Sequence, residues 1–92
     1  MTINELGKIL GEMYENAPDG DKVAMTHLFG IRYSKEIKRN NYIVKEIIKN
    51  TRLKNGSSMN ESYQTEIHKG IKLAEYVIDK NFLYNLIKEF GT

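Results

Sequence analysis

The sequence predicts an all-α protein, a compact bundle of about five short helices. Apolar residues recur at three- and four-residue spacing along most of the 92 residues, which is the period of an amphipathic helix. Hydrophobic residues make up 40% and charged residues 28%, the balance of a globular chain with one modest core. No linker or repeat divides the chain, so we expect a single domain over residues 1–92.

The first predicted helix begins at the N-terminus. Thr2 and Glu5 have the spacing of a capping box, in which each side chain bonds the other residue's backbone amide. Gly7 and Gly11 lie one turn apart, which indicates that another helix approaches closely there. The apolar face consists of Ile3, Leu6, Ile9, Leu10, Met13 and Tyr14.

A turn is predicted at residues 17–20, where Pro18 restricts φ and Gly20 relaxes it. Asp21 is the expected cap of a second helix, and Gly30 is expected to weaken or bend that helix. Its apolar positions are Val23, Met25, Leu28, Phe29, Ile31, Tyr33 and Ile37.

The pair Asn40-Asn41 predicts the next break, with Asn41 as the cap of a third helix. That helix carries a compact apolar stripe of Ile43, Val44, Ile47 and Ile48. Residues 54–58 form the most loop-like stretch, and Ser58 with Glu61 offers a second capping box for a fourth helix.

In the C-terminal quarter, the pattern of apolar residues fits more than one secondary structure. Gly70 is expected to end or bend the fourth helix, and residues 71–78 fit either a helix or a strand, with helix favoured by composition. Residues 79–92 predict a last helix, whose apolar stripe either forms a dimer surface or folds back on its own core. The dimer-interface candidates are Phe82, Leu83, Leu86, Ile87 and Phe90.

The net charge of +2 conceals a strong polarisation along the chain. Residues 1–31 carry a net charge of −3, residues 32–54 carry +6, and residues 55–92 carry −1. A basic segment of this density is a candidate footprint for a polyanion. Its structural alternative is a lysine-rich helix face that only contacts solvent.

Motifs that support catalysis or cofactor binding are missing from the sequence. The chain has no cysteine, no glycine-rich phosphate loop, and only two histidines, His27 and His68, neither in a zinc motif. We therefore expect no enzyme activity, no cofactor and no metal site. No apolar run reaches the roughly 18 residues that a membrane span requires, and we expect a cytoplasmic protein.

A basic helix, a polar loop and a second helix with small or polar exposed residues follow one another between positions 41 and 72. This order predicts a helix-turn-helix-like pair with an extended turn, since the connection from Thr51 to about Ser58 exceeds the usual three or four residues. On the second helix, the side chains suited to base edges in a DNA groove are Ser62, Gln64, Thr65, His68 and Lys69. The candidates for phosphate contacts are Lys45, Lys49, Arg52, Lys54 and Lys72.

Residues 62–77, Ser-Tyr-Gln-Thr-Glu-Ile-His-Lys-Gly-Ile-Lys-Leu-Ala-Glu-Tyr-Val, resemble the C-terminal motif of small bacterial and phage-type HTH-like domain proteins. Residues 27–33, His-Leu-Phe-Gly-Ile-Arg-Tyr, resemble their central helix. The resemblance implies a fold of the DNA-binding type. It also implies that Ser62, Tyr63, Thr65 and Lys69 lie on the recognition helix, although Tyr63 fits a core position equally well.

We therefore expect a small transcriptional regulator that binds double-stranded DNA as a homodimer, because one module of this size covers little DNA surface. The alternative is a protein-interaction module, an inhibitor or adaptor that uses the same shape to bind a protein partner. The acidic pair Glu61 and Glu66 beside the candidate base contacts favours this alternative, because carboxylates repel phosphates.

Overall fold

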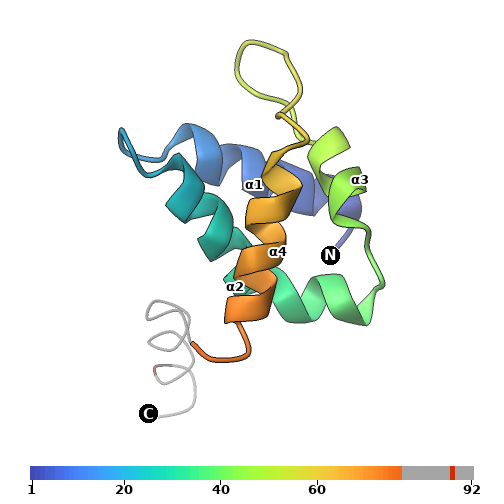
Figure 1. The fold of residues 1–92 in the computed structure, drawn as a ribbon. Coiled ribbons are helices and arrows are strands. Elements are labelled where there is room, and N and C mark those ends of the chain that lie inside the picture. Colours follow the sequence, from blue (N-terminus) through green and yellow to red (C-terminus); the bar gives the residue numbers. More distant parts are fainter. Residues whose placement is uncertain (78–87, 89–92) are drawn as a thin grey trace.

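The computed structural model describes residues 1–77 and Lys88, and this part of the chain contains four helices and no sheet. They are α1 (Ile3–Glu15), α2 (Lys22–Arg39), α3 (Val44–Lys49) and α4 (Tyr63–Leu73). α4 packs most extensively on α2, whereas α3 packs on both α1 and α4 (Figure 1). The all-α prediction is confirmed. The predicted helix at 79–92, with its dimer candidates, lies outside the described residues.

Apolar residues from all four helices, together with Met59 from the α3–α4 connection, form one core. Each of these side chains is at most 4% exposed, and burying one contributes roughly 1.5–3 kcal/mol. The members are Leu6, Leu10, Phe29, Ile37, Val44, Ile47, Ile48, Met59 and Ile67.

Local signals explain where α1 and α2 begin. The Thr2–Glu5 capping box is confirmed: Thr2 Oγ1 accepts from the Glu5 amide at 3.1 Å, and the Thr2 amide donates to Glu5 at 2.7 Å. The turn at 17–20 is confirmed as well, with Gly20 at φ +87°. Asp21 occupies the cap position of α2, but its side chain makes no capping hydrogen bond.

α2 runs unbroken through Gly30 and ends at the predicted break. Asn41 adopts φ +55°, and the amides of Asn41 and Tyr42 donate to the carbonyls of Lys38 and Ile37. This is a Schellman motif, so Asn41 terminates α2. The expectation that Asn41 caps α3 was wrong, because Ile43 holds that position.

The start of α4 also differs from the prediction. Ser58 does not open a helix; it forms an antiparallel bridge with Arg52, and its hydroxyl accepts from the Arg52 guanidinium at 3.1 Å. α4 begins at Tyr63, so residues 50–62 connect it to α3. It continues through Gly70 to Leu73, and residues 74–76 form a turn. The alternative of a strand in this segment is therefore excluded for residues 71–77.

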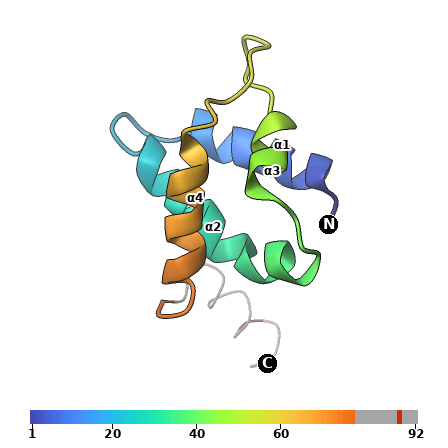
Figure 2. The same cartoon turned by 45° about the vertical axis from the view of Figure 1, so that its right-hand side comes forward.

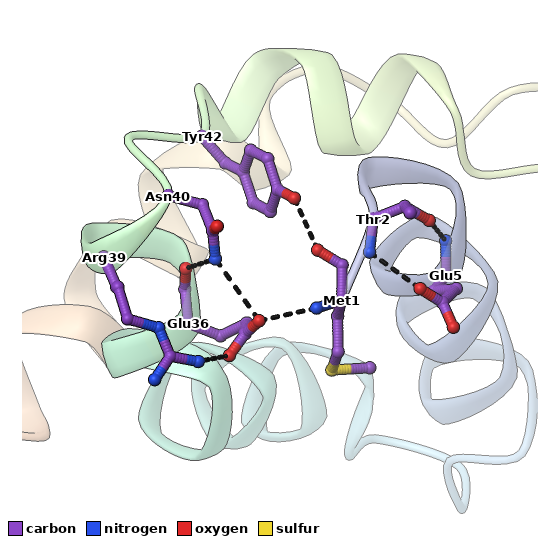
Figure 3. Close-up of polar contacts among 7 residues, drawn as sticks. All are labelled: Met1, Thr2, Glu5, Glu36, Arg39, Asn40 and Tyr42. Carbon is purple, nitrogen blue, oxygen red and sulfur yellow. Dashed lines mark hydrogen bonds and ion pairs between the residues drawn. The ribbon is translucent and has the colours of Figure 1, made fainter.

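A polar cluster fastens the N-terminus to the end of α2 (Figure 3). The α-amino group of Met1 donates to Glu36 at 2.7 Å, and Arg39 contacts the same carboxylate. The Tyr42 hydroxyl donates to the Met1 carbonyl. These contacts place the entry to α1 beside the α2–α3 linker.

Candidate nucleic-acid interface

The position of α4 is set by two glycines. A Cβ on Gly30 would lie 2.4 Å from the Ile67 carbonyl oxygen, and one on Gly70 would lie 2.1 Å from that of His27. Only glycine allows two helix backbones to approach this closely. The crossing buries Ile67 completely and turns the opposite side of α4 toward solvent.

The solvent-facing side of α4 carries most of the candidate base contacts. Ser62, Thr65, Lys69 and Lys72 are exposed and follow one another at spacings of three and four, so they line one face. His68 is exposed at the margin of this face. We call these five residues the α4 strip.

Gln64 and Tyr63 lie off this strip. Gln64 is half-buried on its flank. The Tyr63 ring packs edge-to-face on Tyr14 with centroids 5.1 Å apart, and the two hydroxyls are 3.3 Å apart. That hydrogen bond, with burial, raises the pKa of Tyr63. Tyr63 therefore joins α4 to α1 and serves packing rather than recognition.

The two glutamates near the strip are engaged within the protein. Glu66 contacts His27 Nε2 on α2 and accepts from Lys69 Nζ at 3.2 Å. These hydrogen bonds, that of His27 first, lower the pKa of Glu66, so its carboxylate stays ionised. Glu61 lies 3.9 Å from Lys45 Nζ. Each carboxylate therefore has a cation beside it that reduces its repulsion of a phosphate.

α3 places two phosphate candidates next to the start of α4. Lys45 and Lys49 are exposed and one turn apart, and the Lys45–Glu61 pair brings Lys45 beside the N-terminal end of the strip. Lys49 lies 3.9 Å from Glu46, and Lys72 lies 3.4 Å from Glu75. Such exposed pairs are worth 1 kcal/mol or less, so a phosphate can displace them.

The remaining two phosphate candidates lie in the α3–α4 connection. The Arg52 guanidinium donates to the carbonyls of Lys49 and Thr51 and to Ser58. Lys54 is exposed, and its backbone amide donates to Glu15 at the end of α1. Lys54 is therefore held on the α1 side and not against α4. In both views the connection projects beyond the helices (Figure 2).

Beside the α4 strip lies a hollow of about 500 Å³, which the sequence analysis missed. Ile43, which lies in the chain between the lining residues Tyr42 and Val44, is 63% exposed, although its periodicity predicts burial with Val44, Ile47 and Ile48. Ile43 is exposed because it precedes the first turn of α3 and therefore does not belong to the buried face of that helix. The hollow is lined by Ile37, Lys38, Asn41, Tyr42, Val44, His68 and Ile71.

Within the described residues, no three His, Asp or Glu side chains are grouped so that they could hold a metal ion. None of the described helices is long and apolar enough to cross a membrane.

Residues 2–80 match a family model described as an HTH-like domain. The comparison with curated proteins found no match, and neither did the comparison with solved structures.

Proposed function

Because the chain belongs to the HTH-like domain family, we propose that it binds double-stranded DNA through α4 and acts as a small transcriptional regulator. The α4 strip is the observation that carries this proposal. It presents two lysines, two hydroxyls and an imidazole on the side of the helix opposite to its packing on α2. Such side chains donate to base edges and phosphates in a major groove.

The electrostatics beside the strip support the proposal. The basic segment 32–54 supplies Lys45 and Lys49, which lie on α3 next to the start of α4. Phosphate contacts by these lysines hold the helix in register, while the strip contacts the bases. Glu61 and Glu66 each have a lysine beside them, Lys45 and Lys69 respectively, which reduces the repulsion between these carboxylates and a phosphate.

The test is binding to a pool of duplexes, followed by fluorescence anisotropy at several salt concentrations. Lys45→Glu and Lys49→Glu are expected to weaken binding to every duplex, by about tenfold or more near 0.1 M salt, and to flatten the salt dependence. Lys35→Glu is the matched control, because Lys35 is an exposed lysine on α2 that belongs neither to α3 nor to the α4 strip. Absence of duplex binding by the wild type in low salt would refute the proposal.

A second function is favoured by the hollow beside α4. An exposed isoleucine, Ile43, next in the chain to two residues that line a partly apolar hollow is typical of a protein-interaction surface. Co-purification with one protein, resistant to nuclease and abolished by Ile43→Asp, would support an adaptor or inhibitor in place of a DNA-binding regulator.

A further inference from the structure

Asn55 is the only asparagine in the sequence that directly precedes a glycine, Gly56. The backbone nitrogen of the residue after an asparagine can attack Cγ of the carboxamide and close a succinimide ring. A side chain on that next residue obstructs the attack, whereas glycine has no Cβ and leaves the nitrogen accessible. Asn55 is therefore the asparagine in this chain at which deamidation meets the least steric resistance.

The structure places Asn55 at the tip of a hairpin, residues 52–58, that projects beyond the helices (Figures 1 and 2). An antiparallel bridge between Arg52 and Ser58 closes the base of this hairpin, and the buried Met59 that follows anchors it in the core. Asn55 and both of its neighbours in the chain are exposed, so water reaches the carboxamide. The hairpin therefore has an anchored base and an accessible tip.

The turn at the tip keeps the reacting atoms of Asn55 and Gly56 apart. The Gly56 amide donates to the Leu53 carbonyl at 2.8 Å, so residues 53–56 form a β-turn with Asn55 in its third position. Among the described non-glycine residues only Asn41 has a positive φ; the φ of Asn55 is therefore negative, which makes the turn type I. The third residue of such a turn has ψ of about 0°, which places the next nitrogen beside the residue's own nitrogen and away from its side chain.

Hydrogen bonds also hold the two groups that would react. Asn55 Oδ1 accepts from the Ser57 amide at 3.0 Å and from the Ser57 hydroxyl at 2.7 Å. The attacking nitrogen of Gly56 is engaged as well, because it donates its hydrogen to Leu53. Both groups must leave these partners before the ring can close, which requires the tip of the hairpin to open.

We propose that Asn55 is a site of intramolecular deamidation and that opening of the hairpin tip controls the rate. The Gly56 nitrogen forms a bond to Asn55 Cγ, the Cγ–Nδ2 bond breaks, and the hydrogen of the Gly56 amide leaves with Nδ2 as ammonia. Water then adds to either carbonyl of the succinimide, returns a hydrogen to the Gly56 nitrogen, and leaves an aspartate or an isoaspartate. This chemistry does not depend on DNA binding.

The products differ from Asn55 in both charge and backbone. A carboxylate appears in a segment, residues 51–60, that contains two basic residues and no acidic one. An isoaspartate also carries an additional backbone carbon before Gly56, so the turn that begins at Leu53 loses its register. Because the ammonia is lost to solvent, the extent of reaction records how often the tip has opened.

The first experiment incubates the folded protein for days at neutral pH and locates the mass gain of deamidation by fragmentation of peptides prepared at acidic pH. Asn60 is a matched comparison within the same chain. It is exposed and its Oδ1 accepts from the Ser62 amide at 2.8 Å, but Glu61 follows it. We expect the mass gain at Asn55 and none at Asn60. Equal gains at the two asparagines, or none at Asn55 in either folded or unfolded protein, would overturn the assignment of the site.

The second experiment compares the rate at Asn55 in the folded protein with the rate in guanidinium chloride. The folded rate should be lower by roughly tenfold or more, the factor that corresponds to fixing the backbone of one residue. Ser57→Ala removes one hydrogen bond to the carboxamide, so it should raise the folded rate by about threefold or more and leave the rate in guanidinium chloride unchanged.

Ser62→Ala is the matched control for the serine substitution, because Ser62 is an exposed serine outside the hairpin. This variant should deamidate at the wild-type rate in both conditions. Equal rates at Asn55 in folded and unfolded wild type, or equal folded rates for the two serine variants, would overturn the control by the hairpin.

Discussion

Glu36 connects the N-terminus to the C-terminal end of α2 through one carboxylate that is only 17% exposed. It accepts from the Met1 α-amino group, contacts Arg39 one turn along α2, and accepts from Asn40 Nδ2 at 3.3 Å (Figure 3). The hydrogen bond from the α-amino group, and then the charge of Arg39, lower the pKa of Glu36 below its ordinary value of 4.5. Folding therefore favours the ionised carboxylate.

This pKa shift predicts a pH dependence of stability. A carboxyl whose pKa is lower in the folded state stabilises the fold above the unfolded pKa, and the contribution disappears as pH falls through the folded value. Glu36→Gln should therefore lower the free energy of unfolding at pH 7, and the difference from the wild type should shrink as pH falls below 4.5. Urea unfolding at pH 7, 5 and 3 measures this difference in the free energy of unfolding. Glu12→Gln is the control, because Glu12 is exposed. A difference that stays constant with pH would contradict the argument.

At the scale of the helices, the α2–α4 crossing depends on two glycines whose role the apolar periodicity of the sequence does not reveal. From the sequence, Gly30 was expected to weaken or bend its helix and Gly70 to end or bend its own, and both lie inside continuous helices. Their Cα atoms meet at the crossing, where a Cβ on either would come within 3.0 Å of the other glycine's Cα. The prediction of close approach at Gly7 was correct, because a Cβ there would lie 2.7 Å from the Asn50 carbonyl oxygen.

Gly70→Ala should accordingly be strongly destabilising, by about 3 kcal/mol or more, because the added methyl group meets a backbone oxygen that has no room to move. Gly11→Ala is the matched control. Its methyl group would meet Thr51 Cγ2 at 3.3 Å, and alanine's higher helix propensity offsets part of that contact, so a change below about 1 kcal/mol is expected. Urea denaturation distinguishes the two, and equal stability of both variants would show that the crossing does not depend on Gly70.

At the scale of the whole molecule, the fold redistributes the charges that the sequence separates into segments. Cations of the +6 segment pair with carboxylates from elsewhere in the chain, as Lys45 does with Glu61 and Lys38 with Glu75. The segment therefore does not form an uninterrupted positive surface. What favours DNA binding is the position of individual cations around α4, and a net charge alone does not provide that.

The size of the interface also concerns the whole molecule. In the proposed function, one α4 strip would cover a single half-site, so we expect a homodimer that reaches two half-sites. The expected dimer contacts, between positions 82 and 90, lie outside the described residues and rest on the apolar spacing in the sequence. Sedimentation at micromolar concentration should show a dimer, and the double variant Leu83→Asp, Leu86→Asp should sediment as a folded monomer. A wild type that sediments as a monomer would contradict this expectation.

The sequence by itself determined the features that depend on neighbours within about one helical turn. The α1 capping box, the turn before α2, the break near Asn41 and the all-α class all follow from interactions between residues that are close along the chain. The site candidates Thr65, His68, Lys69 and Lys72 could likewise be chosen from the spacing of apolar residues, which leaves them on the exposed face of α4.

Only the tertiary structure decided where α4 begins, what Gly30 and Gly70 do, and how the glutamates are engaged. The Ser58 capping box failed because Met59 is buried in the core and Ser58 pairs with Arg52 instead. His27 and Glu66, 39 residues apart, come together only because α2 and α4 cross at the two glycines. Contacts of this kind depend on packing between distant segments, which no local spacing records, and they determine which side of α4 is free to bind.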